Sequence, residues 1–311
     1  MIGYDETLTA ATIRDDQSIG RMWLRGKDRA ALLHRLSTND IERLRPGQGA
    51  RTALLTPIGR TIDLLTVYAL DDALLLLTSP GQGAAVFGLL KRNIFFNDQV
   101  TIEPAARSHA LLTLYGPLAA AILRAEIRPD LHHHWAHELA GQSVLAAQTL
   151  GLHGGAFNLL IPADGLAAAR GALAEAGATP LDDAAYDALQ VEMGYGAFGR
   201  ELSQEYIPLE TGLLDAISFT KGCYVGQEII ARMESRGRLA KLLRGVRFDG
   251  ELPEPGPILM DGANAGQLTS VVVSPRFGPI GLGYIKTALA EPGGPVAVGG
   301  VAGTIVELPF G

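Results

Sequence analysis

The only cysteine of the chain lies among residues that could activate a thiol. Cys223 follows Lys221 by two positions, and residues 227–233 behind it have the apolar spacing of a helix. An ammonium group and the positive end of a helix both favour the thiolate, which is the form that attacks electrophiles and binds metals. Free cysteines are also among the most buried residue types, so an inert packing role for Cys223 stays open.

The segment Lys221–Glu228, with the sequence KGCYVGQE, resembles the signature of the YgfZ family. These folate-binding proteins are related to the T-protein (aminomethyltransferase) of the glycine cleavage system. The stretches 36–40, 208–210 and 266–270 agree in order and spacing, so the resemblance covers nearly the whole chain. It implies tetrahydrofolate as cofactor, a role in the assembly or repair of iron–sulfur clusters, and iron–sulfur client or assembly proteins as partners.

The resemblance also implies where folate would bind, and where this chain departs from T-proteins. Asp63 matches one of two adjacent T-protein aspartates, whereas Leu64 occupies the other position. Asn158 replaces a glutamate that grips the pterin, and Gln190 replaces a later arginine. Both changes weaken charge-assisted contacts, which counts against aminomethyl transfer but leaves open a folate bound in another pose.

Together these considerations predict two sets of site residues. Lys221 would hold the thiolate or a folate carboxylate, and Gln227 would orient the loop. Asp63 could instead be an exposed strand residue, and Glu192 a solvated helix residue. The predicted catalytic residues are Cys223, Lys221 and Asp63. The predicted cofactor-binding residues are Asn39, Asp63, Asn158, Glu192, Tyr195, Lys221 and Gln227.

A metal site is not predicted. The segment 132–137, HHHWAH, would place His133 and His137 on one face of a helix. It lacks the glutamate of an HExxH motif and a second group of ligands, so a solvated polar segment is expected. One cysteine cannot hold a whole iron–sulfur cluster, so any cluster contact would be transient or shared with a partner. No Walker loop, GxSxG elbow or strand-linked GxGxxG occurs, which excludes NTPase, hydrolase and dinucleotide-binding functions of those types.

Composition and charge limit the class of protein and the kinds of partner that are expected. The 311 residues are 47% hydrophobic and 19% charged, as in globular proteins, and the formal net charge is -7. Without a basic run, nucleic acid is not an expected partner. No apolar run reaches the length of a membrane span. A lone cysteine cannot form an internal disulfide, and the first residues lack a signal-peptide pattern, so a cytoplasmic location is predicted.

The order of the expected elements predicts an α+β fold. Two similar series of strands and helices cover about residues 19–103 and 109–176, a further helix covers 181–193, and short strands with Gly and Pro turns follow residue 240. We therefore predict two related α/β units with antiparallel sheets and a C-terminal antiparallel β-barrel. The resemblance implies a three-domain ring with folate at its opening. The predicted domains are 1–105, completed by 185–235, then 106–180, and 240–311.

The principal hypothesis is thus a cytoplasmic tetrahydrofolate-binding protein that acts in iron–sulfur cluster assembly or repair. The first alternative is an aminomethyltransferase of the glycine-cleavage type. The second is a non-catalytic interaction module that kept the fold and lost the ligand. Whether the protein turns over a substrate is left open, and if it does, a folate-dependent transferase is expected.

Overall fold

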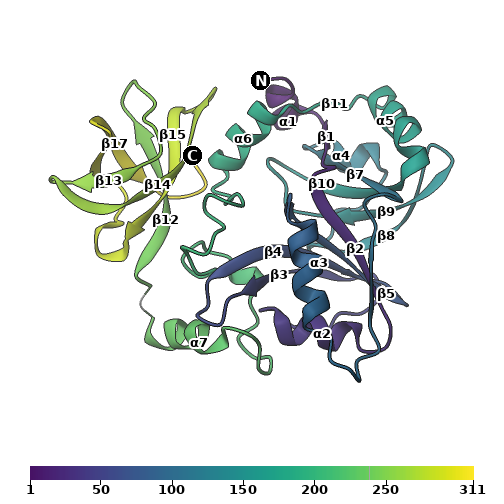
Figure 1. Ribbon diagram of the computed structural model, residues 1–311. Coiled ribbons are helices and arrows are strands. Elements are labelled where there is room, and N and C mark those ends of the chain that lie inside the picture. Colours follow the sequence, from purple (N-terminus) through teal and green to yellow (C-terminus); the bar gives the residue numbers. More distant parts are fainter. Residues whose placement is uncertain (238) are drawn as a thin grey trace. The chain divides into compact units, whose positions relative to one another are not determined.

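The computed structural model describes residues 1–237 and 239–311, and its contacts divide the chain into two compact units. The first unit comprises Met1–Leu54, Asp63–Ala185 and Asp215–Val225, and it contains two β-sheets. The second comprises Leu55–Ile62, Tyr186–Leu214 and Gly226–Gly311, and it contains a closed barrel. Figure 1 labels the elements of both units.

One sheet of the first unit has the strand order β3-β4-β5-β2-β6. Some of its strands alternate apolar and polar residues and bury one face. Others have continuous apolar runs and bury both faces. Helix α3 packs on β2, β5 and β6, and α2 contacts β5. The elements are β2 (Ile19–Arg25), α2 (Arg29–Leu36), β3 (Gly49–Leu55), β4 (Thr61–Ala69), β5 (Ala73–Pro80), α3 (Gly83–Arg92) and β6 (Thr101–Pro104).

The other sheet has the order β11-β1-β7-β10-β9-β8, and only the short β1–β11 pair is parallel. Helices α4 and α5 contact β10. The elements are α1 (Tyr4–Thr9), β1 (Thr12–Asp15), β7 (His109–Tyr115), α4 (Ala119–Ile122), β8 (His134–Leu139), β9 (Gln142–Gln148), β10 (Ala156–Pro162), α5 (Leu166–Glu175) and β11 (Thr179–Pro180).

The two sheets share an apolar interface. Tyr68 and Leu75 from the first sheet pack in one buried cluster with Leu111, Ala147 and Leu160 from the second. Burial of these side chains away from water stabilises the pairing of the sheets. The two sheets therefore form one continuous body, which positions the polar residues of β4 and β10 near each other.

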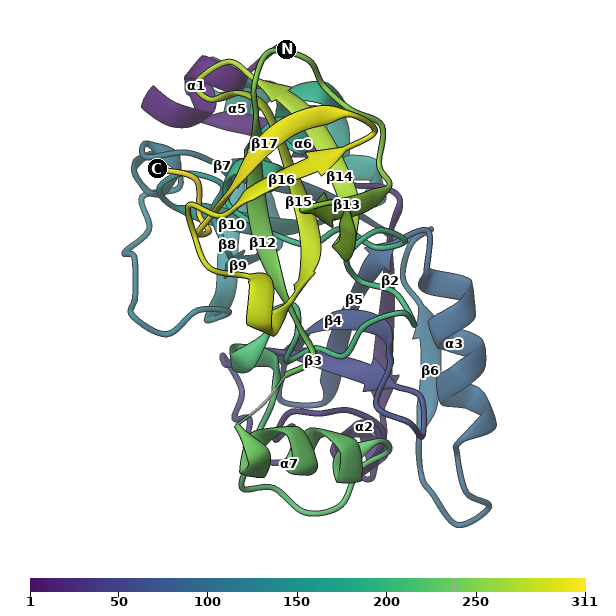
Figure 2. The same ribbon diagram turned by 90° about the vertical axis from the view of Figure 1, so that its left-hand side faces the viewer.

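The second unit is built around a barrel whose strands follow the order β12-β15-β14-β13-β16-β17, and Figure 2 shows these strands curving around one core. Alternate residues point inward, among them Val246, Leu268 and Ile305. The elements are α6 (Asp183–Glu192), α7 (Gln227–Arg236), β12 (Lys241–Phe248), β13 (Pro257–Met260), β14 (Ala263–Ser274), β15 (Gly278–Lys286), β16 (Pro295–Val298) and β17 (Val301–Val306).

The predicted α+β class, with antiparallel sheets and a C-terminal barrel, is confirmed. The helical reading of the histidine segment is wrong, because His134–Leu139 form strand β8, paired with β9. The rings of Trp135 on β8 and Phe157 on β10 pack edge to face in that sheet. Within the described part of the chain, no helix is long and apolar enough to cross a membrane.

Candidate functional site

Cys223 is exposed on the loop that leads into α7. The packing role that the sequence left open is therefore wrong. The loop ends at Gly226, whose φ of 83° suits glycine, and a Cβ there would lie 2.8 Å from the carbonyl oxygen of Thr56. The predicted helix begins at Gln227, four positions after the cysteine. The chain thus presents a free thiol to solvent.

Lys221 fixes the start of this loop from inside the first unit. Its side chain is only 7% exposed, and Nζ donates hydrogen bonds to the carbonyl oxygens of His34 (2.5 Å), Ser37 (2.8 Å) and Asn39 (2.8 Å). Three acceptors use all three ammonium protons, so none remains for a thiolate or a folate carboxylate. Burial lowers the pKa of Lys221 to about 8, and the nearby carboxylates of Asp40 and Glu42 oppose that shift.

Asn39 is one of the residues that hold the Lys221 side chain. Its side-chain amide donates to the carbonyl oxygens of Arg51 (2.8 Å) and Asp215 (2.9 Å), and its own carbonyl oxygen accepts from Lys221. The structure therefore brings these two predicted site residues together. Their contacts tie the end of α2 to β3 and to the segment before the cysteine loop.

Asp63 is completely buried on β4, at 0% exposure. Strand alternation places it on the inward face with Thr61 and Leu65, so the exposed-residue alternative is wrong. Its carboxylate accepts from the backbone N–H of Leu64 (2.9 Å) and of Ser79 (3.3 Å). No basic side chain among the described residues pairs with it. Burial raises its pKa to about 6, against a lowering by hydrogen bonds from the Ser79 side chain and from these two backbone N–H groups.

Asn158 lies on β10, where its amide links the two sheets. Nδ2 donates to the hydroxyl of Tyr68 at 2.9 Å, and Oδ1 lies 3.0 Å from Thr113 Oγ1. Thr113 in turn donates to Asp16, 2.6 Å away, whose pKa is raised by burial. Asn158 is thus part of a polar chain inside the first unit.

The remaining predicted residues belong to the second unit. Glu192, at the end of α6, is 1% exposed and binds Arg276 (2.6 Å) and the hydroxyl of Ser274 (2.6 Å). The solvated-helix alternative for Glu192 is therefore wrong. Tyr195 is half-buried in the turn after α6, and Gln227 is the half-buried first residue of α7.

A buried histidine that the sequence did not predict lies close to Arg51, whose carbonyl oxygen accepts from Asn39. His132 is 4% exposed, has a left-handed φ of 66°, and both of its ring nitrogens lack a partner within the residues that the structure describes. Burial, followed by the charge of Arg51, lowers its pKa to about 4, so the ring is neutral at pH 7. Arg51 itself binds both oxygens of Asp215. In the sequence His132 is only one of a run of three histidines, and no local pattern there indicates its burial.

Metal ligands do not gather in the described regions, where no group of three His, Cys, Asp or Glu side chains could hold an ion. The histidines of β8 alternate across a sheet instead of sharing one face. The groups that could take part in chemistry are therefore the buried carboxylate of Asp63 on β4 and the exposed thiol of Cys223.

Comparison with known proteins gives consistent matches. Residues 4–221 match the model of the GCVT N-terminal domain, and residues 241–310 match that of the glycine cleavage T-protein C-terminal barrel domain. A putative chloroplastic transferase of Arabidopsis thaliana, At1g60990, is 33% identical over 98% of this chain and 73% of its own length. An aminomethyltransferase of Rubrobacter xylanophilus is 31% identical over 99% of this chain and 85% of its own.

The fold has a solved counterpart. The glycine cleavage system aminomethyltransferase T from Bartonella henselae superimposes with a TM-score of 0.86 over 99% of this chain and 88% of its own, at 22% identity. At that identity the likeness concerns the fold alone.

Proposed function

Since this chain belongs to the glycine cleavage T-protein family, we propose that it is a YgfZ-type member, which binds tetrahydrofolate and acts in the assembly or repair of iron–sulfur clusters. The observation that carries the proposal is the exposed Cys223 on a loop that Lys221 anchors. A thiol held in a fixed loop meets a large partner without first being uncovered, which suits transient contact with sulfur or iron on a client protein.

The folate part of the proposal is supported by Asp63. A buried carboxylate without a cation partner is costly, and such groups concentrate at functional sites. The pterin ring carries several N–H donors, which are the groups that a carboxylate accepts from. Tetrahydrofolate supplies nitrogen atoms that carry one-carbon groups. Because Asp63 is closed to solvent, a ligand reaches it only when neighbouring side chains move aside.

The other predicted binding residues take a supporting part in this proposal. Lys221 and Asn39 hold the loop and the end of α2, and Asn158 holds the two sheets together through Tyr68. Glu192 ties α6 to Ser274 and Arg276 of the second unit. These residues would act by positioning, because their own polar atoms already have protein partners.

Aminomethyl transfer is the second candidate, favoured by the relatives that carry the name aminomethyltransferase. Leu64 and Asn158 stand where T-proteins have an aspartate and a glutamate, and neither can accept a proton at neutral pH as a carboxylate does. An assay with an aminomethylated lipoyl carrier and tetrahydrofolate separates the candidates. We expect no transfer, and turnover well above the uncatalysed rate would establish the alternative.

Complementation tests the iron–sulfur role. In a bacterial strain that lacks its own protein of this type, the wild-type chain should restore the activity of an iron–sulfur enzyme, whereas Cys223→Ser should fold normally and fail to restore it. Cys223 is exposed, so a small polar replacement should change stability by no more than about 0.5 kcal/mol. Full restoration by the serine variant would contradict a role for the thiol. The cytoplasmic location stays a prediction, since the Arabidopsis relative is chloroplastic by name.

A further inference from the structure

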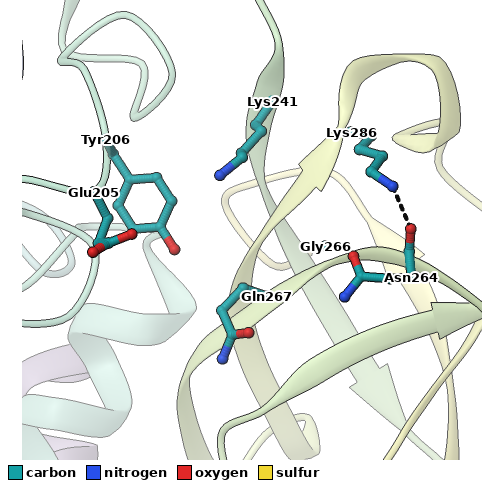
Figure 3. Close-up of a pocket in the computed structure, with 7 residues that line it drawn as sticks. All are labelled: Glu205, Tyr206, Lys241, Asn264, Gly266, Gln267 and Lys286. Carbon is teal, nitrogen blue, oxygen red and sulfur yellow. Dashed lines mark hydrogen bonds between the residues drawn. The ribbon is translucent and has the colours of Figure 1, made fainter.

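A polar cavity of about 480 Å³ lies within the second unit, between the segment before the cysteine loop and the first strands of the barrel. Figure 3 shows its side chains facing one open space, with Glu205 and Tyr206 on one side and the barrel residues on the other. This volume is within the usual range for small-molecule sites, roughly 300–1,000 Å³. The lining residues are Glu205, Tyr206, Lys241, Asn264, Gly266, Gln267 and Lys286.

Two lysines of this cavity are direct neighbours in the barrel. Lys241 begins β12 and Lys286 ends β15, and the two residues are paired across these antiparallel strands. Like charges directly opposite each other destabilise a sheet. Lys286 donates one hydrogen bond to the carbonyl oxygen of Asn264, and Lys241 lies 5.2 Å from the ring of Tyr206. Neither lysine forms an ion pair with a described carboxylate, so their charges lack a protein counterion there.

Tyr206 adds a hydroxyl donor that forms no hydrogen bond with a described residue. The residue is 5% exposed, and its ring stacks on Tyr284 at a centroid distance of 3.4 Å. Tyr284 OH lies 2.6 Å from Thr211 Oγ1 and donates to the carbonyl oxygen of Glu201, whereas Tyr206 OH makes no hydrogen bond to any described residue. Burial and the nearby carboxylates, Glu205 first, raise the pKa of Tyr206 to about 12. The hydroxyl therefore stays protonated and able to donate.

We propose that this cavity binds a small anionic molecule, with a carboxylate or phosphate group held between Lys241, Lys286 and the hydroxyl of Tyr206. The anion neutralises two opposed ammonium groups and gives Tyr206 its acceptor. Gln267 offers an amide to the same ligand, and Glu205 accepts from a hydroxyl or amine on the part of the ligand away from the anion. The residues that line this cavity are none of the residues proposed to bind folate.

Thermal unfolding with two probes tests the site. Inorganic phosphate and glutarate are titrated separately into the full chain at constant ionic strength, which distinguishes a phosphate from a carboxylate ligand. At least one probe should raise the melting temperature of the wild type in a saturable way. Lys241→Met or Lys286→Met should weaken the apparent affinity about tenfold or more, because each removes a charged donor. Tyr206→Phe keeps the stacked ring and should weaken it by a smaller factor.

Lys27→Met serves as the matched control, because Lys27 is an exposed lysine of the first unit. It should behave as the wild type with both probes. Without ligand and at low salt, the double variant Lys241→Met, Lys286→Met should melt no lower than the wild type, because a repulsion has been removed. If neither probe stabilises the wild type more than this double variant, the proposal is wrong.

Discussion

Two buried charged side chains of the first unit, Asp63 and Lys221, have different hydrogen-bond partners. Asp63 lies on β4 and Lys221 lies in the loop before Cys223, and both side chains are buried in the first unit. Lys221 has a carbonyl acceptor for every ammonium proton, whereas Asp63 accepts hydrogen bonds from Leu64 and Ser79 and has no cation partner among the described residues. Burial still shifts the pKa of both groups toward the neutral form, to about 8 for Lys221 and to about 6 for Asp63, so neither set of partners fully offsets the desolvation. A buried carboxylate without a cation partner supports the proposal that Asp63 contacts a ligand.

The raised pKa of Asp63 makes stability depend on pH in a defined direction. Between the unfolded value of 3.8 and the folded value of about 6, the native state binds more protons than the unfolded state. The free energy of unfolding therefore falls as the pH rises from about 4 to 6, by up to about 3 kcal/mol. In Asp63→Asn this loss should be absent.

Urea unfolding of both proteins at pH 4 and pH 7 measures the effect. The wild type should lose stability relative to Asp63→Asn between the two pH values. Asp130→Asn, at an exposed position, is the control and should follow the wild type. An equal difference between variant and wild type at both pH values would mean that Asp63 titrates normally.

At the scale of elements, periodicity predicted the strands and helices, and partners distant in sequence decided the rest. Alternation along β4 was evident, but Ile62 and Leu64 made either face plausible as the buried one, so Asp63 could not be placed. The partners of Lys221 lie 182–187 positions away, which no local pattern reveals. The predicted helix after Cys223 begins at Gln227, directly after Gly226, the last residue of the loop.

The cysteine loop should depend on its anchor at Lys221. Lys221→Met keeps most of the volume but leaves three carbonyl oxygens without their charged donor. We expect a loss of about 2–4 kcal/mol in the free energy of unfolding. Unfolding in urea measures it, with Lys27→Met as a control that should stay within about 0.5 kcal/mol of the wild type. Unchanged stability in Lys221→Met would show that the buried amine does not hold the loop.

For the whole molecule, the eight-residue motif and the order of elements indicated a YgfZ-type relative of the T-proteins. The matches to both T-protein domains confirm the T-protein family, and the YgfZ assignment stays a proposal. The sequence predicted a fold of two sheets and a barrel because the antiparallel strands are short, alternating and separated by turns. It could not predict the cavity of the second unit, because Lys241 and Lys286 become neighbours only through strand pairing. The proposed cavity site depends on such contacts between residues distant in sequence, whereas the strands and helices follow from local patterns.

Equilibrium dialysis with labelled tetrahydrofolate tests the central claim most directly, because it measures bound ligand without relying on a heat or a spectral change. The wild type and the exposed control Asp130→Asn should bind one equivalent in a saturable way, and Asp63→Asn should bind at least about tenfold more weakly, since a neutral amide replaces a charged acceptor. Absence of saturable binding by the wild type at millimolar ligand would contradict the assignment of this chain as a folate-binding protein.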